Sequence, residues 1–218
     1  MSSLNRILIW GASGHASVVA DIDRAEAKFE IAGLIDDLNP SPRAMAFGQV
    51  QGGRTELPKL LASGVRHILI GIGDNAVRAK LAAHAESLGF QLAQAIHPRA
   101  TFATGLAVGK GTVAMAGAVI NPGTRVGNNV IINTGASVDH DCLVGDGVHI
   151  CPGTHVAGNV AIGEGTFVGI GSAVRDRVRI GSRCVIGAGS VVVGDLPDDV
   201  LAYGNPARMM RNLRDLSV

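Results

Sequence analysis

The feature that most constrains the fold is a six-residue repeat in the second half of the chain. Each six-residue unit has one apolar residue at a fixed position. In most units Gly or Asn stands three positions after it, and these residues tolerate the positive φ of a tight corner. Four positions after the apolar residue stands a small or apolar residue, such as Thr112, Ala118 or Cys142. Such internal repetition specifies a solenoid more strongly than any single motif. The apolar residue recurs at every sixth position, without an insertion, at Ile96, Phe102, Val108, Ala114, Ile120, Val126, Ile132, Val138, Val144, Ile150, Val156, Ile162, Val168, Val174, Ile180, Ile186 and Val192.

A longer period of 18 residues is nested in this repeat and is marked by Gly109, Gly127, Gly145, Gly163 and Gly181. Because this period equals three six-residue units, each coil should have three flat sides. Successive coils should then stack about 4.8 Å apart, like the strands of a sheet. The alternative, a Gly-rich disordered segment, does not account for the unbroken apolar register.

The composition agrees with such a core and excludes several classes of function. Aromatic residues are 3% and Gly accounts for 30 of 218 residues, so small and β-branched side chains must build the core. With 17% charged residues and a formal net charge of +1, nothing favours nucleic acid or an anionic membrane as a partner. Three cysteines without a C-x-x-C pair disfavour a disulfide framework, and no apolar run is long enough for a bilayer. We therefore expect a soluble cytoplasmic protein.

The first half of the chain follows a different rule, in which apolar runs alternate with helical patterns. Strands are predicted over 6–10, 29–35 and 67–71, and helices over 15–27, 57–63 and 75–88. This order predicts a small parallel sheet that binds ligands at the carboxyl ends of its strands. We expect a Rossmann-like α/β domain over 1–95, an all-β parallel helix over 96–197 and a C-terminal tail over 198–218.

The whole chain resembles one branch of the hexapeptide-repeat acyltransferases, the sugar acetyltransferases related to bacterial PglD and NeuD. The resemblance implies a left-handed β-helix, a homotrimer with active sites between its subunits, and acetyl-CoA as co-substrate. It also implies that the C-terminal tail contributes to the CoA site. The matching segments are Gly-Ala-Ser-Gly-His at 11–15, Asp36-Asp37, Gly-Ile-Gly-Asp-Asn at 71–75, Asn133-Thr134, His140-Asp141 and Tyr-Gly-Asn-Pro-Ala-Arg at 203–208.

His140 is the candidate general base. It is third in its six-residue unit, in a solvent-facing column at a corner. His149 and His155 are sixth in their units, on outward flat faces, so none of the three should be a buried core histidine. An imidazole with a pKa near 6.5 suits removal of a proton from an attacking amine or hydroxyl. Either Asp141 or Asp139 would orient the ring, and the resemblance assigns catalysis to the pair His140-Asp141.

The resemblance also assigns a site for acetyl-CoA. Asn133 and His149 match family positions that line this site, where His149 would help to stabilise the developing oxyanion. Gly158 lies one coil above His140, so its missing side chain would leave room for the acyl group. The segments that resemble those accepting the pantetheine arm and the adenine end contain Gly187, Ala188 and Pro206.

A zinc site is not expected, because His149 and His155 face different sides of the coil and cannot share a metal within one subunit. Several apolar side chains should also face outward, and such a surface predicts a subunit interface. These outward residues are Val113, Val119, Ile131, Leu143 and Phe167.

A second site is expected in the first half, where the turn of Gly11, Ser13 and Gly14 opens a helix whose free amides suit an anionic phosphate. Asp36 follows at the distance found in dinucleotide sites, so a nicotinamide cofactor stays open, although the G-x-G-x-x-G fingerprint is incomplete. A plain strand-end turn is the other interpretation of the acidic pair at 36–37. The resemblance instead assigns the turn to a nucleotide sugar, together with His15, Asp36, Asp37 and Asn75, and with His15 near the sugar or its amine.

We therefore expect an N-acetyltransferase that moves an acetyl group directly from acetyl-CoA to a UDP- or GDP-linked 4-amino-4,6-dideoxy sugar, without a metal. One alternative is O-acetylation of a sugar such as sialic acid. Another is a non-catalytic nucleotide-binding module on a trimeric scaffold. The sequence leaves the nucleotide base, the stereochemistry of the sugar and the choice of amine or hydroxyl open.

Overall fold

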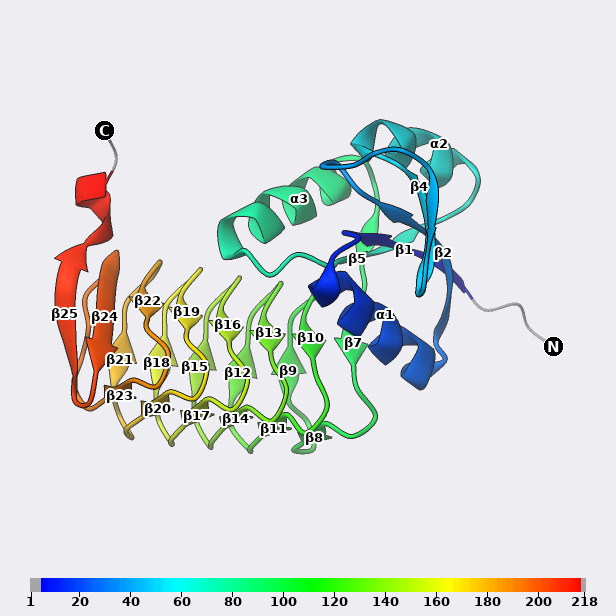
Figure 1. Ribbon diagram of the computed structural model, residues 1–218. Helices are drawn as coiled ribbons and strands as arrows, with labels where there is room; N and C mark the ends of the chain where they lie inside the picture. Colours follow the sequence, from blue (N-terminus) through cyan, green and yellow to red (C-terminus); the bar gives the residue numbers. More distant parts are fainter. Residues whose placement is uncertain (1–4, 217–218) are drawn as a thin grey trace. The chain divides into compact units, whose positions relative to one another are not determined.

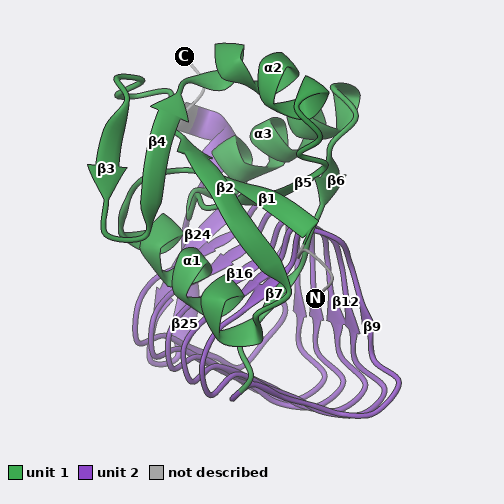
Figure 2. Cartoon of the chain, turned by 90° about the vertical axis from the view of Figure 1, so that its right-hand side faces the viewer, with its two compact units in different colours: residues 1–98 green, residues 99–218 purple. Residues whose placement is uncertain are grey.

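The computed structural model describes residues 5–216 and divides into two compact units, residues 1–98 and 99–218 (Figure 2). Unit 1 is built on a six-stranded sheet of order β3-β4-β2-β1-β5-β6. Its neighbouring strands are parallel except β3 and β4, which form an antiparallel hairpin at one edge. Its elements are β1 (Asn5–Trp10), α1 (Gly14–Glu26), β2 (Phe29–Ile35), β3 (Arg43–Met45), β4 (Gly48–Gly52), α2 (Leu57–Ala62), β5 (His67–Ile70), α3 (Asn75–Ser87), β6 (Gln91–Leu92) and β7 (Ala95–Ile96).

The core of unit 1 explains why a parallel sheet forms. All four residues of the run Ile7–Trp10 are at most 1% exposed, as expected for a central strand covered on both faces by helices. The predicted alternation of strands and helices is confirmed. The β3–β4 hairpin was not predicted, because β3 has only three residues and β4 buries one large side chain, Val50. Such short strands carry no period-two signal in the sequence.

Unit 2 is a stack of three-sided coils built from two-residue strands (Figure 1). Side 1 contains β10 (Val113–Ala114), β13 (Ile131–Ile132), β16 (His149–Ile150), β19 (Phe167–Val168) and β22 (Val185–Ile186), and is extended by the hairpin β24 (Val200–Gly204) and β25 (Ala207–Asn212). Side 2 contains β8 (Thr101–Phe102), β11 (Val119–Ile120), β14 (Ser137–Val138), β17 (His155–Val156), β20 (Ala173–Val174) and β23 (Val191–Val192). Side 3 contains β9 (Ala107–Val108), β12 (Arg125–Val126), β15 (Leu143–Val144), β18 (Ala161–Ile162) and β21 (Arg179–Ile180).

The predicted register of this solenoid is confirmed. Each strand from β8 to β20 pairs in parallel with the strand 18 residues later, as Ser137 does with His155. The second residue of each strand points inward, and the small residue immediately before each strand from β10 to β23, such as Thr112, Ala118 or Thr124, is buried as well. Buried hydroxyls among them are satisfied across coils: Thr124 Oγ1 donates to the Asp139 carbonyl at 2.6 Å, and Thr166 Oγ1 donates to that of Gly181 at 2.7 Å.

The 18-residue glycine column has a steric cause. A Cβ on any of these five residues would lie within 2.4 to 2.8 Å of backbone atoms of the next coil, closer than real Cβ atoms approach. The corners have a conformational cause, because their residues adopt the left-handed region. Asp141 does so with φ 58° and Asn159 with φ 60°.

One expectation about the outer faces is wrong. His149 was expected to be exposed on side 1, but it is 7% exposed. Its neighbours on the adjacent coils of this face are the apolar residues Ile131 and Phe167. The Phe167 ring packs edge-on against the imidazole, with 5.2 Å between the ring centroids. Val113 and Ile131 are at most 1% exposed, so these two are not available for the interface that was expected to include them. Within residues 5–216, no helix has the length and apolarity needed to cross a membrane.

Candidate active site

His140 lies at the corner between sides 2 and 3, in the turn that follows β14. Its Nδ1 is 2.9 Å from Oδ2 of Asp141, which occupies the left-handed corner position. Asp139 does not bond the ring: its Oδ1 accepts a hydrogen bond from the backbone N–H of His140 at 2.8 Å. Of the two candidate partners for the imidazole, the geometry selects Asp141.

The environment of this imidazole suits a general base. The side chains of His140 and Asp141 are 53% and 61% exposed. The hydrogen bond that Nδ1 of His140 donates to Asp141 raises the pKa of His140, and the negative charge of Asp139 acts in the same direction. Because Nδ1 is bonded to Asp141, the lone pair of the neutral ring belongs on Nε2, which has no hydrogen bond within the described chain.

Two glycines enclose the His140-Asp141 pair. A Cβ on Gly158 would lie 2.6 Å from Nε2 of His140, and a Cβ on Gly123 would lie 2.2 Å from Oδ1 of Asp141. Gly158 therefore stacks against His140 as expected, but the imidazole itself fills the space that was expected for an acyl group. Gly123 was not singled out in the sequence, because it is one of many repeat glycines.

A second polar cluster lies at the corner between sides 1 and 2. The Asn133 amide nitrogen is 3.0 Å from Nε2 of His149, and its Oδ1 accepts from the Thr134 backbone N–H at 2.8 Å. In the same corner column, Gly187 lies against β24, because a Cβ there would be 2.7 Å from Cβ of Tyr203. Ala188 is exposed beside it, and Pro206 is exposed in the β24–β25 turn, where its peptide bond to Asn205 is cis.

The structure thus brings the predicted residues of unit 2 together in two groups. His140, Asp141 and Gly158 share the corner between sides 2 and 3. Asn133 and Gly187 share the corner between sides 1 and 2, and side 2 separates these corners within every coil. One protomer therefore does not assemble all of these residues into one site.

A groove of about 460 Å³ runs along the outer face of side 3, starting one coil before that of His140. Leu143, Ala161 and Leu196 make its floor apolar, and Leu143 is 51% exposed. Arg125 and Arg179 lie at its two ends, and within the described chain neither guanidinium has a hydrogen bond or an ion pair. A thin ligand with anionic groups matches these features.

The cysteines are poorly suited to nucleophilic catalysis. Cys142, Cys151 and Cys184 are free and buried, and burial raises the pKa of each thiol, to about 12 for Cys151. Among residues 5–216, no group of three or more His, Cys, Asp or Glu side chains is arranged to hold a metal ion.

In unit 1, the predicted phosphate turn lies between β1 and α1. Gly11 has φ 138°, and a Cβ there would lie 2.7 Å from the Gly71 carbonyl oxygen. Ser13 is the N-cap of α1 but makes no side-chain cap, and Gly14 is exposed with open space beside it. Half-buried His15 follows, and burial, with the Arg78 charge next, lowers its pKa to about 4. His15 is therefore neutral at physiological pH.

The acidic pair after β2 is engaged inside unit 1. Asp36 accepts from Arg43 at 2.5 Å and from the backbone of Leu38 and Asn39. Burial raises the pKa of this carboxyl, but these hydrogen bonds outweigh it and the pKa falls. Asp36 therefore closes a strand-end turn.

Asp37 has a similar set of partners. It accepts from Trp10 Nε1 at 3.1 Å and from the Arg54 guanidinium at 2.8 Å, and its pKa is lowered as well. These contacts favour the strand-end interpretation over direct contact with a ligand.

Asn75 begins α3, and its side chain is held by a residue that sequence reasoning missed. Arg78 is 1% exposed; its Nη2 donates to Asn75 Oδ1 at 2.8 Å, and its Nη1 donates to the Gly73 carbonyl at 3.0 Å. Burial lowers the pKa of this guanidinium to about 10. Arg78 thus fixes the loop at 71–75, and its position one turn into an amphipathic helix was the only available signal.

Comparison with known proteins identifies both halves of the chain. The family described as PglD N-terminal domain matches residues 6–85, and the bacterial transferase hexapeptide family matches residues 159–194. Perosamine N-acetyltransferase from Caulobacter crescentus, solved with CoA and GDP-perosamine, is 40% identical with a TM-score of 0.92, covering 96% of this chain and 99% of that one. The PglB acetyltransferase domain from Neisseria gonorrhoeae, solved with acetyl coenzyme A, is 38% identical with a TM-score of 0.88, covering 95% and 100%.

A curated relative agrees. UDP-N-acetylbacillosamine N-acetyltransferase from Bacillus subtilis is 34% identical over 126 residues, and the match spans about half of each protein, 52% in both cases. The predicted fold, a PglD-type domain followed by a left-handed hexapeptide β-helix, is confirmed. The chain therefore belongs to the PglD-like family of hexapeptide-repeat sugar N-acetyltransferases, whose members are solved with CoA bound.

Proposed function

We propose that this protein transfers the acetyl group of acetyl-CoA to the amine of a UDP- or GDP-linked 4-amino-4,6-dideoxy sugar. The observation that carries the proposal is an exposed imidazole whose Nδ1 is bonded to Asp141 and whose Nε2 is free to accept a proton. The relatives support the substrate class, since one is solved with CoA and GDP-perosamine and another is named for a UDP-linked sugar. Acetylated nucleotide sugars are building blocks for polysaccharide or glycan synthesis.

The chemical step needs only a base and a way to stabilise charge. The amine attacks the thioester carbonyl while Nε2 of His140 accepts its proton, and Asp141 stabilises the resulting imidazolium. The new C–N bond replaces the C–S bond, and the proton passes from the imidazolium to the departing CoA thiolate. No acyl-enzyme is required, which agrees with the burial of all three cysteines.

We propose a homotrimer, because the predicted residues occupy two corners of one protomer. Asn133 and His149 of one subunit would face His140 of a neighbour, and His149 would donate to the developing oxyanion. The Asn133 amide donates to Nε2 of His149 at 3.0 Å and fixes the buried ring, so Nδ1–H would be the group that donates to the oxyanion. Gly187, Ala188 and Pro206 would then contact the CoA held between the subunits.

The groove on side 3 is a candidate path for the CoA arm. It passes the coil of His140, and a guanidinium at each end would attract phosphate groups. Arg125 and Arg179 are separated by three coils, roughly 14 Å along the stack, with apolar Leu143 and Ala161 between them. The extended phosphopantetheine arm of CoA is thin and carries its negative charge on phosphate at one end, which suits this arrangement.

In unit 1 we propose that the turn of Gly11, Ser13 and Gly14 binds the phosphates of the nucleotide sugar. His15 is neutral, so it can donate a hydrogen bond without adding charge near the amine. Asn75, held by Arg78, would contact the sugar or base. Asp36 and Asp37 would shape this site through their arginine partners.

The test is a thermal-shift and turnover panel of UDP- and GDP-linked amino sugars with and without acetyl-CoA, alongside NAD and a sialic acid. A true substrate stabilises the fold by mass action. We expect one nucleotide amino sugar to raise Tm and to yield an N-acetyl product with stoichiometric release of CoA. Stabilisation by NAD alone, or acetylation of a hydroxyl alone, would overturn the proposal.

A further inference from the structure

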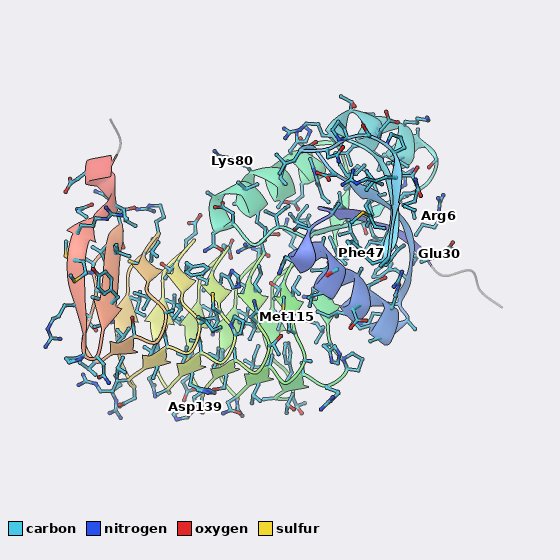
Figure 3. All side chains as sticks on the ribbon, viewed as in Figure 1. Arg6, Glu30, Phe47, Lys80, Met115 and Asp139 are labelled. Atoms are coloured by element: carbon cyan, nitrogen blue, oxygen red, sulfur yellow. The ribbon has the colours of Figure 1, made fainter. Side chains whose placement is uncertain are left out.

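The corner of His140 contains a hydrogen-bonded chain that reaches down to the preceding coil. Asn121 Nδ2 donates to Asp139 Oδ1 at 2.7 Å, and the same oxygen accepts the backbone N–H of His140 at 2.8 Å. Asp139 is labelled in Figure 3 and lies at the outer edge of the β-helix. Asn121 stands 18 residues before Asp139, directly below it in the stack.

The two carboxylates that flank His140 therefore act on different atoms. Asp141 bonds the imidazole, whereas Asp139 bonds the backbone from which the imidazole projects. The hydrogen bonds from Asn121 and from the His140 backbone lower the pKa of Asp139, so it is a carboxylate at neutral pH. Without the amide of Asn121, this carboxylate would be held by one hydrogen bond instead of two and could rotate towards the ring.

The remaining contacts of this turn support a fixed position for His140. Asn159 N–H donates to the His140 carbonyl at 2.9 Å from the coil above, and Thr124 Oγ1 donates to the Asp139 carbonyl from the coil below. The imidazole also rests on Gly158. The backbone and ring of His140 are thus held from both neighbouring coils, and Asn121 is the side chain that anchors the Asp139 carboxylate.

We propose that Asn121 is a positioning residue for catalysis, which holds the Asp139 carboxylate on the His140 backbone and so leaves the imidazole with Asp141 as its one carboxylate partner. This inference rests on the proposed function, because it matters only if His140 accepts the proton of the amine. A displacement of a reacting group by about 1 Å can lower a rate roughly 100-fold.

A second Asn–Asp pair in the β-helix serves as a control for a purely structural role of the Asn121–Asp139 pair. At the corner between sides 3 and 1, Asn128 Nδ2 donates to Asp146 Oδ2 at 3.0 Å, again across 18 residues. This amide also joins adjacent coils, although Asp146 is held in addition by the backbone N–H of Asn128 at 2.8 Å, and no histidine stands next to Asp146. If Asn121 only joins coils, removing either amide should have the same consequence.

The experiment compares Asn121→Ala with Asn128→Ala by steady-state kinetics and thermal unfolding. We expect similar losses of Tm for both, a drop in kcat of roughly 10-fold for Asn121→Ala alone, and KM values for both substrates within about two-fold of wild type. Asn121→Asp keeps the shape but removes the donor and opposes two carboxylates, so it should lower kcat at least as much. Equal kcat values for Asn121→Ala and Asn128→Ala would overturn the proposal.

A double-mutant cycle then asks whether Asn121 acts through Asp139. In an Asp139→Ala background, Asn121→Ala should lower kcat by less than about two-fold further, because the carboxylate it holds is gone. Additive losses would contradict the inference. His140→Ala separates this outcome from the proposed function: full turnover of that variant defeats the function, whereas loss of turnover with an inert Asn121 defeats only the positioning role.

Discussion

The two units differ in how the neighbours of a residue depend on its position in the sequence. In the β-helix, a side chain's surroundings follow from its number within the 18-residue coil, so His140, Gly158 and Asn121 meet because they occupy stacked positions at one corner. In the α/β unit, the candidate site depends on contacts between residues far apart in sequence, as when Asp37 meets Trp10 and Arg54. A solenoid allows one position to change with little effect on the fold, and a small sheet with one core does not.

The difference also appears in the charges. At the His140 corner the ionisable groups are exposed, so their interactions contribute little to stability. In the α/β unit, Arg78 and Asp23 are each 1% exposed, so a change in either affects the core itself. Substitutions should therefore alter turnover in the first case and stability in the second.

The largest expected effect is that of His140→Ala. Loss of the general base should lower kcat by roughly 10² to 10⁴-fold. The imidazole is about half exposed and stacks against Gly158, so Tm should stay close to wild type. Turnover by coupled detection of free CoA and Tm by scanning calorimetry test both parts, and a large loss of Tm would break the contrast between the units.

A smaller loss of kcat, caused by displacement of the His140 ring, is expected for Gly158→Ala. The new Cβ would lie 2.6 Å from Nε2 of His140, so the ring must move, and kcat should fall by roughly 10 to 100-fold. Gly194→Ala is the control, because Gly194 occupies the same corner column two coils further and has open space around it. If both variants retain wild-type kcat, the packing of the imidazole on Gly158 has no role in catalysis.

Asp141→Asn should mainly change the pH dependence of kcat/KM, with a smaller effect on kcat at the optimal pH. The carboxylate raises the pKa of His140, and a general base works only when neutral, so activity falls as pH drops through that pKa. Removing the charge lowers the pKa, and the acidic limb of kcat/KM should move to lower pH. We also expect kcat at pH 8 to fall by about 10-fold, because the ring loses its orienting bond. An unmoved acidic limb would show that this carboxylate does not set the titration.

The smallest effect, and one confined to stability, is expected in α1. Burial, and next the charge of Glu26, raises the pKa of Asp23 to about 6, and its Oδ2 is buried with no hydrogen-bond partner among residues 5–216. The folded state then binds more protons than the unfolded state between about pH 4 and 6, so stability falls as pH rises through that window. Asp23→Asn should raise the free energy of unfolding by about 2 kcal/mol at pH 7.5 and have no effect below pH 4.

Denaturant unfolding at the two pH values measures this gain. Asp21→Asn, a change at an exposed position of the same helix, is the control and should be neutral at both. A pH-independent effect of Asp23→Asn would mean that its carboxyl titrates normally in the folded state. A change in kcat larger than about two-fold would instead link this helix to catalysis and weaken the separation between the units.

The sequence by itself determined the solenoid, its register, the corner of His140 and the stacking of Gly158, because a six-residue period maps each residue to a side or corner through local geometry. It could not decide which carboxylate holds the imidazole, since Asp139 and Asp141 are both adjacent to His140 and only the left-handed turn directs Asp141 to the ring. The prediction from sequence was also wrong about the exposure of His149, because an outward position in the coil does not by itself keep a side chain exposed.

In unit 1, the order of strands and helices followed from the alternation of patterns, but the partners of its polar residues did not. Arg43 and Arg54 reach the acidic pair from other segments, and the Arg78 side chain folds back onto the loop before its own helix. Only the tertiary structure decided these contacts. A repeat encodes neighbours at a fixed sequence distance, whereas a sheet of crossed connections brings together residues that no local period relates.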